Sequence, residues 1–526
     1  MKLNLIPQPV EVKAHDGTFT LAPDARIIAA SKGAEDAAGL LARYLRPATG
    51  FALPVAKGAP KNGDIVLREH GRGTEDCHGF GDESYALAVT AARAEIDAPG
   101  RLGLLRGIQT LRQMFPAAIY AAKKQAKTQW IVPCAAIKDR PAYRWRGLHL
   151  DVSRHFFTVE EVKRFIELLA QHKFNILHWH LTDDQGWRLE IKKYPKLTTV
   201  GSIRKKTLVG HNETYPHKFD GKPHKGFYRQ SEVKNVVAFA AARGVTIVPE
   251  IDMPGHMQAA IAAYPQLGNY PETNFGVREM WAISQHILNP SPVTVKFMEN
   301  VLDEVLKLFP SKYIHIGGDE ALKREWQESE YANLRMAELR CRNADEMQTW
   351  FMREIGKYLQ KKGRFYIGWD DILEGGLPDG AAIMNWHATG SSWDNHALDK
   401  ATAAKQYVIN ADSSFTYFDH YQAMPENEPL AIGGYLPCEK VYAYRPESTL
   451  PPAQAKYVLG GQGQLWTEYI GTMQYLEYMA YPRACALAEK LWSPRGIDTF
   501  RGFVDRLGAA HRERLNAQQV HAHPLP

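Results

Sequence analysis

The stretch YIHIGGDE, at residues 313–320, is the segment from which the rest of the chain can be interpreted. Its apolar run, ended by two glycines and two acids, predicts a buried strand that presents carboxylates at its tip. Neighbouring strand side chains point to opposite faces, so Asp319 and Glu320 can converge on one ligand only if the chain leaves strand geometry. Glycine can adopt the backbone angles of such a break at little energetic cost. The alternative is that Asp319 caps the next helix and Glu320 is solvated.

Outward from this stretch, the chain repeats a strand, loop and helix rhythm between residues 141 and 495. The expected strands are RGLHLDV from 146, FNILHWHL from 174, VTIVPEID from 245, KYIHIGGDE from 312, RFYIGWDD from 364, AAIMNWH from 381, QYVIN from 406 and VLGGQGQLW from 458. Eight such units predict a (β/α)8 TIM barrel, an α/β fold whose active site lies at the carboxyl ends of its strands.

Helices are expected between several of these strands. Thr158 with Glu161, and Asn343 with Glu346, have capping-box spacing ahead of helices at 159–172 and 344–361. Residues 468–491 are expected to form one closing helix, and 496–526 a further helix and tail packed on the barrel. Two connections, 195–230 and 412–455, are longer than simple turns, which favours functional or mobile loops.

Residues 1–140 have a different rhythm. Short strand-like runs (ARIIAA, GDIVLRE, ESYALAVT, RAEIDA) alternate with two helical segments, DAAGLLARYL and RLGLLRGIQTLRQMF. This pattern predicts a small α+β domain with an antiparallel or mixed sheet. It carries no cluster of catalytic residue types, so we expect it to support the barrel.

Composition excludes several classes of protein. The chain has 526 residues, 45% of them hydrophobic and 23% charged, as in an ordinary globular protein. A net charge of +6 without a long Lys/Arg run argues against nucleic-acid binding. Five scattered cysteines without CxxC spacing imply neither a disulfide framework nor a zinc knuckle.

No membrane association is predicted, because no apolar run is long enough to span a bilayer. Residues 1–10 lack the basic and apolar regions of a secretory signal, which predicts a cytoplasmic protein. A periplasmic or secreted location follows instead if a signal was trimmed. Oligomeric state stays open, and a homodimer is one option.

Polar and aromatic residues gather at the predicted strand ends. In strand order they are Arg154, Asp183 with Asp184, His256, Asp319 with Glu320, Trp369, Trp386, Tyr417 with Asp419, and Trp466 with Glu468. Singly, Arg154 could form a surface ion pair, His256 could cap a helix and each tryptophan could belong to the core. Together they predict a sugar pocket, because indole faces stack on pyranose rings while carboxylates and guanidinium groups bind hydroxyls.

These residues lie in segments that resemble a known family. GLHLDVSRHF, FNILHWHLTDDQGWRLE, IVPEIDMPGH, YIHIGGDE, IGWDD and GGQGQLWTEY, in this order, look like the family-20 glycoside hydrolases, the exo-acting β-N-acetylhexosaminidases. The likeness covers residues 144–495. The opening IPQPVEV and the stretch from ESYALAVT to LRQMF are similar to the small domain that precedes the barrel in that family.

The resemblance implies a retaining mechanism that is substrate-assisted and needs no enzymatic nucleophile and no cofactor. Glu320 would be the general acid and base. Asp319 would hold the N–H of the 2-acetamido group, whose carbonyl oxygen attacks C1 to give an oxazolinium ion. Tyr417 would hydrogen-bond that oxygen.

The resemblance also implies the binding residues. Trp369, Trp386 and Trp466 would wall the sugar pocket. Arg154, Asp419 and Glu468 would bind ring hydroxyls of a terminal N-acetylglucosamine or N-acetylgalactosamine. His256 and Asp183 would form a pair that tunes Glu320, with a swapped role for Asp184 left open. The aglycone, whether from chitooligosaccharide, glycan or cell wall, stays undetermined.

Two other functions compete with this one. A metal-dependent barrel hydrolase would use His178 and His180, which share one strand face, with ligands drawn from Asp183, Glu250, Asp252 and His256. A sugar-binding protein without catalysis would keep the pocket but would not need a general acid beside an anion. The histidines of the first long loop, His211, His217 and His224, are interpreted as part of a solvated lid.

Overall fold

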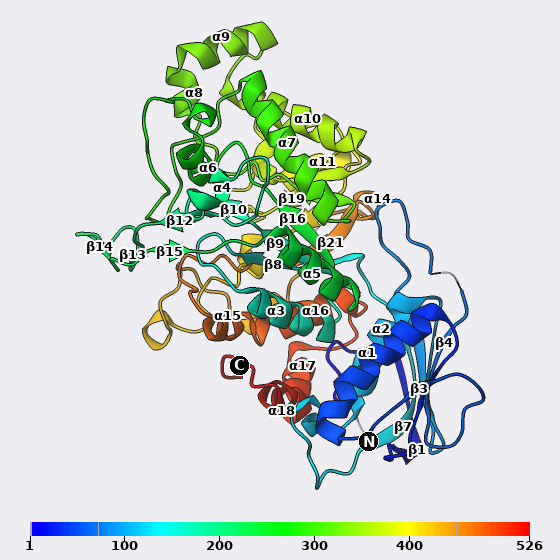
Figure 1. Cartoon of the computed structure of the whole chain (residues 1–526). Helices are drawn as coiled ribbons and strands as arrows, with labels where there is room; N and C mark the ends of the chain where they lie inside the picture. The colour runs from blue at the N-terminus through cyan, green and yellow to red at the C-terminus, as the bar shows by residue number, and fades with distance from the viewer. Residues whose placement is uncertain (1–2, 72, 448–449, 526) are drawn as a thin grey trace.

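Eight parallel strands close into a barrel in the computed structural model, which describes residues 3–71, 73–447 and 450–525 (Figure 1). Around the barrel the strand order is β16-β17-β18-β19-β20-β21-β8-β9. Their bounds are β8 (Trp145–Asp151), β9 (Ile176–His180), β16 (Thr246–Glu250), β17 (Tyr313–His315), β18 (Phe365–Trp369), β19 (Ala381–Asn385), β20 (Val408–Asn410) and β21 (Val458–Gly463). The predicted TIM barrel, with one strand for each predicted run, is confirmed.

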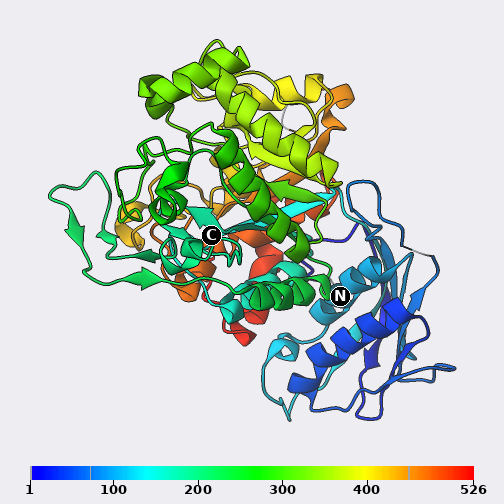
Figure 2. The ribbon, with the colours of Figure 1, turned by 45° about the horizontal axis from the view of Figure 1, so that its top comes forward.

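Helices surround this barrel on the outside (Figures 1 and 2). They include α3 (Val159–Gln171), α5 (Gln230–Ala241), α7 (Pro292–Leu308), α10 (Ala344–Lys361), α11 (Ala397–Ala403), α13 (Cys438–Tyr442), α14 (Pro452–Ala455), α15 (Met473–Ala480) and α16 (Arg483–Trp492). The capping box of α3 is present, with Thr158 and Glu161 each bonded to the other's backbone. At α10, Asn343 caps the helix, but the Glu346 carboxylate accepts from the backbone of Arg342 instead.

One helix prediction is wrong. The closing helix expected at 468–491 is two helices, α15 and α16, with Tyr481 and Pro482 between them. Proline lacks the N–H that an uninterrupted helix would need and its ring clashes with the preceding turn, so the helix ends before Pro482 and restarts after it.

The N-terminal domain is built on a seven-stranded mixed sheet with α1 (Lys32–Thr49) and α2 (Arg101–Met114) packed on it. In sheet order the strands are β1 (Glu11–Thr20), β7 (Ile131–Asp139), β5 (Tyr85–Val89), β6 (Ala94–Ala98), β4 (Ile65–Glu69), β2 (Ile27–Ala29) and β3 (Val55–Ala56). The predicted α+β class is confirmed. The long edge strand β1 was missed because most of its side chains are exposed, so it lacks alternating apolar residues.

A loop of this domain, residues 73–83, closes the amino-terminal end of the barrel. His78 Nδ1 lies 2.8 Å from the hydroxyl of Tyr313, at the start of β17, and its ring packs against Phe365 and Tyr407. Phe80 packs edge-on against Trp145. The barrel therefore has its pocket at one end and a plug from another domain at the other.

Buried ion pairs also join the two domains. Glu83 of the N-terminal domain binds both Arg106 on α2 and Arg146 on β8. Lys173, which follows α3, lies 2.7 Å from Asp139 at the end of β7, and both side chains are fully buried. Removal of one partner of such a pair is strongly destabilising, since the other charge is then left unpaired in a dry interior.

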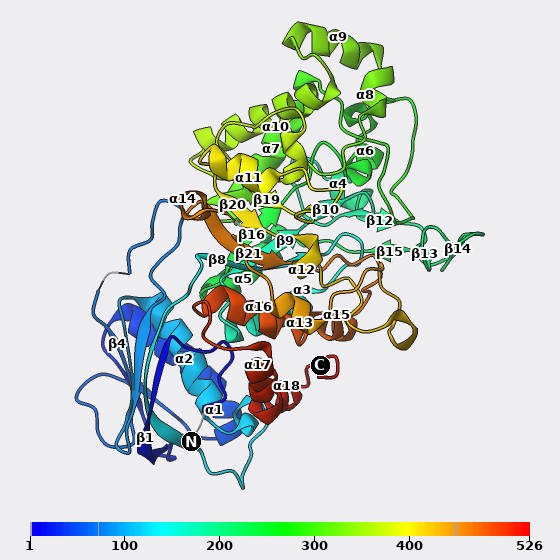
Figure 3. The same cartoon turned by 180° about the vertical axis from the view of Figure 1, so that it is seen from behind.

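The carboxyl-terminal segment lies beside both domains (Figure 3). It consists of α17 (Phe500–Arg506), a π-helical turn (Leu507–His511) and α18 (Arg512–Ala517). Arg514 donates to the backbone carbonyls of Asn4 and Gln113, in the N-terminal domain. The prediction that this segment packs on the barrel was therefore incomplete.

Short elements fill the long connections at the pocket end. They are β10 (Thr182–Asp183), β11 (Gly186–Trp187), α4 (Lys196–Thr199), β12 (Ile203–Arg204), β13 (Leu208–Val209), β14 (Lys218–Phe219), β15 (His224–Lys225), α6 (Gln258–Ala263), α8 (Arg324–Glu328), α9 (Glu330–Leu339) and α12 (Ser413–Thr416). The β13–β14 pair projects from the body of the molecule (Figure 1). Within the described ranges, every helix is too short or too polar to cross a lipid bilayer.

Candidate active site

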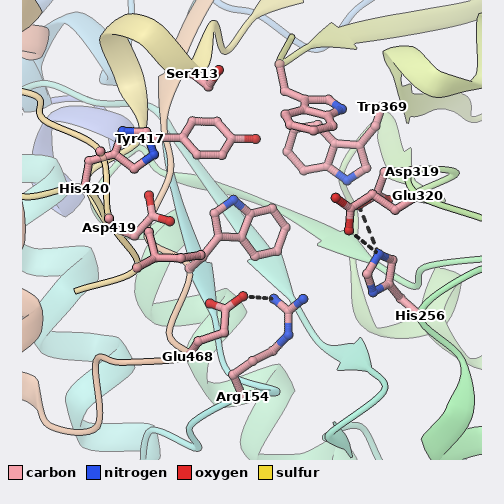
Figure 4. Close-up of a pocket in the computed structure, with 15 residues that line it drawn as sticks. Arg154, His256, Asp319, Glu320, Trp369, Ser413, Tyr417, Asp419, His420 and Glu468 are labelled. Carbon is pink, nitrogen blue, oxygen red and sulfur yellow. Dashed lines mark ion pairs between the residues drawn. The ribbon is translucent and has the colours of Figure 1, made fainter. Parts of the chain in front are cut away.

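A cavity of about 350 Å³ opens at the carboxyl ends of the barrel strands (Figure 4). This volume lies within the range of small-ligand pockets. Its walls are formed by Arg154, His256, Asp319, Glu320, Trp369, Trp386, Ser413, Tyr417, Asp419, His420, residues 432–434, Trp466 and Glu468. Every predicted site residue lines it except Asp183 and its alternative, Asp184.

The backbone after β17 turns the adjacent acids Asp319 and Glu320 toward this cavity. Gly317 and Gly318 have φ angles of 64° and 103°, in the left-handed region that glycine favours. A Cβ atom at Gly317 would lie 1.6 Å from the Asp252 carboxylate, so no larger residue fits there. Glu320 itself has a φ of 48°, a left-handed backbone conformation that costs energy in a residue with a side chain. The predicted break in strand geometry is present.

His256 connects the two acids. Its Nε2 atom lies 3.4 Å from Asp319 Oδ2 and 3.4 Å from Glu320 Oε2 (Figure 4). Burial opposes the charged imidazolium, but the Asp183 and Asp319 carboxylates raise the pKa of His256 well above its ordinary value. Burial raises the pKa of Asp319 to about 6; His256 opposes this rise, whereas Glu250 and Glu320 add to it.

Asp183 lies behind the wall rather than on it. It is 1% exposed, with its carboxylate 3.2 Å from His256 Nδ1 and 2.9 Å from Arg154 Nη2. The short β10–β11 hairpin after β9 turns it away from the cavity. Asp183 therefore contacts two residues that face the cavity rather than the cavity itself, and its contact with His256 agrees with the pair expected from the sequence.

The neighbouring Asp184 has a different environment. Its carboxylate accepts from the backbone N–H groups of Gln258, at 3.0 Å, and Ser284, at 3.3 Å, and lies 3.6 Å from His256 Nδ1. Asp183 is thus the closer partner of His256, and Asp184 ties surrounding loops together.

A second polar group lies across the cavity (Figure 4). Arg154 Nη1 is 3.8 Å from Glu468 Oε1 and 3.1 Å from Asp151, at the end of β8. Asp419 is 4% exposed, and its Oδ1 atom has no hydrogen-bond partner among the described residues. Burial, with Glu468 nearby, raises the pKa of Asp419 well above its ordinary value. This arrangement offers both donors and acceptors to hydroxyl groups.

Aromatic rings enclose the space between these polar groups. Trp369 and Trp466 lie 5.8 Å apart between ring centroids, and Trp386 is nearly parallel to Tyr417 at 6.3 Å. The guanidinium of Arg154 lies 5.1 Å from the Trp466 ring centroid. The Tyr417 hydroxyl points into the cavity (Figure 4). A pyranose ring would find apolar faces and fixed hydrogen-bonding groups together here.

Several contributing residues were missed in the sequence. Asp371, in the 3-10 turn after β18, accepts from the indole N–H of Trp386 at 2.7 Å and from the backbone N–H of Glu320 at 3.1 Å. The second Asp of IGWDD was the available signal. Ser413, His420 and residues 432–434 come from the long loop after β20, whose path no local pattern specifies.

The residues of the predicted metal site lie deeper than the cavity. His178 and His180 lie on one face of β9, as their spacing predicted; this face points into the barrel interior, where both side chains contact Glu250. All three side chains are fully buried. Of the proposed metal ligands, only His256 also lines the cavity.

The loop histidines do not behave as a solvated group. The Phe156 backbone N–H donates to His224, His217 contacts the backbone carbonyl of Asn212, and the His211 ring packs against Tyr469. Each histidine is partly buried in its own surroundings.

Comparison with known proteins decides the family. The description "Glycosyl hydrolase family 20, catalytic domain" matches residues 143–495, and "Glycosyl hydrolase family 20, domain 2" matches residues 2–140. The chain belongs to glycosyl hydrolase family 20. The resemblance seen in the sequence is confirmed, and the family-20 barrel carries the pocket described above.

Individual relatives agree with this assignment. The chain is 38% identical to a beta-hexosaminidase of Porphyromonas gingivalis. The alignment covers 100% of this chain and 65% of that protein. It superimposes on a family-20 beta-N-acetylhexosaminidase from Streptomyces coelicolor with a TM-score of 0.86 and 31% identity, covering 100% of this chain and 98% of the other.

A mutant Streptomyces plicatus beta-hexosaminidase in complex with product (GlcNAc) superimposes with a TM-score of 0.86 and 32% identity. The superposition covers 100% of this family-20 chain and 97% of that protein.

Proposed function

We propose that this protein is an exo-acting β-N-acetylhexosaminidase that removes terminal, non-reducing, β-linked N-acetylglucosamine or N-acetylgalactosamine with retention of configuration. The observation that carries the proposal is the position of two carboxylates, Asp319 and Glu320, opposite the ion pair of Arg154 and Glu468 across one aromatic cavity. The names of the relatives support it.

The proposed reaction begins with protonation of the glycosidic oxygen. Glu320, whose side chain is 33% exposed at the cavity, gives its proton to the leaving alcohol. The carbonyl oxygen of the substrate's own acetamido group attacks C1 as the bond to the alcohol breaks, which forms an oxazolinium ion. Family-20 enzymes are among the exceptions to the two-carboxylate scheme because their substrates supply this nucleophile.

Asp319 is proposed to bind the acetamido N–H as positive charge develops on the ring. Its Oδ1 atom has no hydrogen-bond partner among the described residues, and its neighbours Gly318 and Glu320 both have positive φ angles. Tyr417 is proposed to donate to the acetamido carbonyl oxygen and hold it in line with C1.

Water completes the reaction. Glu320, now a carboxylate, removes a proton from water as the oxygen attacks C1 on the side that the alcohol left. The C1 bond to the acetamido oxygen breaks, and the amide is restored. Two displacements at C1 give overall retention.

The two competing functions are less well supported. A metal hydrolase would need its ligands beside the cavity, whereas His178 and His180 lie inside the barrel, where each contacts Glu250. A protein that only binds sugar would not need an acid pair in a strained turn, with Glu320 at a φ of 48°.

One comparison tests the proposal. Hydrolysis rates should be measured on the p-nitrophenyl β-glycosides of N-acetylglucosamine, N-acetylgalactosamine and glucose. We expect cleavage of at least one N-acetylated sugar and almost none of the plain glucoside, which lacks the internal nucleophile. Fast cleavage of the glucoside would contradict the substrate-assisted reaction, and the ratio of the two N-acetylated sugars gives the epimer preference.

A further inference from the structure

A chain of buried side chains continues from the active site into the middle of the barrel. His180, at the end of β9, lies with Nε2 2.9 Å from Asp183 Oδ2 and with Nδ1 2.5 Å from Glu250 Oε2. Asp183 in turn contacts His256, which contacts Glu320. Four contacts thus connect the proposed general acid to a carboxylate on β16.

Glu250 also holds the opposite wall of the pocket. Its Oε1 atom accepts a hydrogen bond from the indole N–H of Trp369 at 2.8 Å and lies 3.0 Å from His315 Nδ1. Its Oε2 atom lies 3.0 Å from His178 Nε2. Glu250 is fully buried, and its position is set by strand register, because it pairs with His180 on β9 and His315 on β17.

The charges along this chain alternate. Burial opposes ionisation, but the histidines around Glu250 lower its pKa well below the ordinary value. The Glu250 and Asp183 carboxylates overcome burial and raise the pKa of His180 well above its ordinary value. Burial lowers the pKa of His178 to about 4, so that ring stays neutral near pH 7.

The remaining groups that face Glu250 and His180 complete this environment. His149 on β8 packs against His178 and His180, and burial lowers its pKa well below the ordinary value. Asp252 follows β16, and burial together with Asp319 raises its pKa well above the ordinary value. Gln462 on β21 contacts His178 Nδ1. The cation on His180 is therefore held between the two anions, Asp183 and Glu250.

We propose that His180 and Glu250 are positioning residues that tie the general acid Glu320 and the pocket wall Trp369 to one buried anchor. This inference rests on the proposed function. A carboxylate is stable in a dry interior only when its hydrogen-bonding partners are present. Displacement of Glu250 would therefore disturb two branches: the contacts that run through His180 to Glu320, and the hydrogen bond to Trp369. Loss of His180 would disturb the branch toward Glu320 and the Arg154 contact of Asp183, but it would leave the hydrogen bond between Trp369 and Glu250 in place.

Leaving-group dependence tests the branch toward Glu320. Proton donation matters for a disaccharide such as chitobiose, whose leaving alcohol is a poor one, and much less for a p-nitrophenyl glycoside. In His180→Gln we expect kcat/KM to fall about 100-fold on chitobiose but less than about tenfold on the aryl glycoside, as for loss of a supporting hydrogen bond. Binding of free N-acetylglucosamine, measured by calorimetry, should weaken less in His180→Gln than in a Glu250 variant, because Trp369 keeps its hydrogen bond to Glu250.

The Glu250→Gln variant tests the anchor. It should show the same leaving-group dependence and, in addition, bind N-acetylglucosamine about tenfold more weakly, because the hold on Trp369 is weakened. His172→Gln is the matched control. It removes another fully buried imidazole that takes no part in the contacts between Glu320 and Glu250, and it should leave the ratio of the two substrate rates unchanged.

The outcomes separate clearly. Equal losses on both substrates in His180→Gln, or unchanged sugar binding in Glu250→Gln, would overturn the inference. If either variant fails to fold, His180→Asn and Glu250→Asp provide smaller changes with the same expected order of effects. A stoichiometric metal ion in the purified protein, with activity lost on chelation, would also overturn it. A wild-type protein that cleaves neither substrate would overturn the proposed function itself.

Discussion

The backbone N–H of Glu320 donates a hydrogen bond to the carboxylate of Asp371 at 3.1 Å. The other oxygen of the same carboxylate accepts from the indole N–H of Trp386 at 2.7 Å. One side chain thus fixes both the strained residue that carries the proposed acid and a ring of the pocket wall. Burial, with Asp370 and Asp319, raises the pKa of Asp371 to about 7.

Asp371→Asn should lower kcat on chitobiose by about 10- to 100-fold, because an amide has one acceptor oxygen for two N–H donors and leaves one unpaired. Kinetics on this substrate provide the measurement. Asp303→Asn, a change at an aspartate on α7 outside the pocket, is the control and should have no effect on kcat. Unchanged kcat in Asp371→Asn would show that Glu320 keeps its position without this contact.

The same substitution should change how stability depends on pH. A carboxyl with a raised pKa in the folded state contributes its stability fully below about pH 4, its unfolded value, and loses it as pH rises through about 7. The Tm of the wild type minus the Tm of Asp371→Asn should therefore decrease as the pH rises from 4 to 8. Thermal unfolding at several pH values measures this, and a constant difference would contradict it.

Glu320→Gln should lose nearly all activity on unactivated substrates, because the proposed proton donor is removed. Steady-state kinetics on chitobiose, with wild type and variant at the same pH, provide the measurement. Unchanged turnover would sink the assignment of Glu320. Glu328→Gln, a change on α8 away from the pocket, is the matched control.

Asp319→Asn should lower kcat by about two to four orders of magnitude, on the scale of a lost preorganised electrostatic group. Because burial raises the pKa of Asp319 to about 6, the wild-type rate should fall as pH decreases through that value. This acid limb should be absent from the variant. A normal rate in Asp319→Asn would mean that the residue only supports the local backbone.

Gly317→Ala should unfold the turn that carries the acids. The added Cβ would lie 1.6 Å from Asp252 Oδ1, in addition to the cost of a φ of 64°. Gly363→Ala is the control, since its φ is 74° and a Cβ there meets no described atom within 4 Å. We expect the control to lose about 1–2 kcal/mol of unfolding free energy and Gly317→Ala to lose clearly more. Equal losses in chemical denaturation would refute the steric argument.

Much of this site could be predicted because strand periodicity and strand-end position are local properties. His178 and His180 were placed on one strand face, and that face is the barrel interior. Glu250 was grouped with them only as a possible metal ligand, because their direct contact depends on the register between β9 and β16. Asp183 was placed at the wall because the sequence does not reveal the β10–β11 hairpin that turns it away.

The plug formed by residues 73–83 has a consequence for dividing this protein into parts. His78 and Phe80 complete the floor of the barrel, where Tyr313, Phe365 and Trp145 would otherwise face water. A fragment that starts at residue 141 would expose that aromatic surface and lose the partners of Arg146 and Lys173. The boundary near residue 141 separates two domains in the sequence, but the side chains that close the amino-terminal end of the barrel come from both sides of that boundary. A barrel transplanted into another protein would therefore have to carry the loop of residues 73–83 with it.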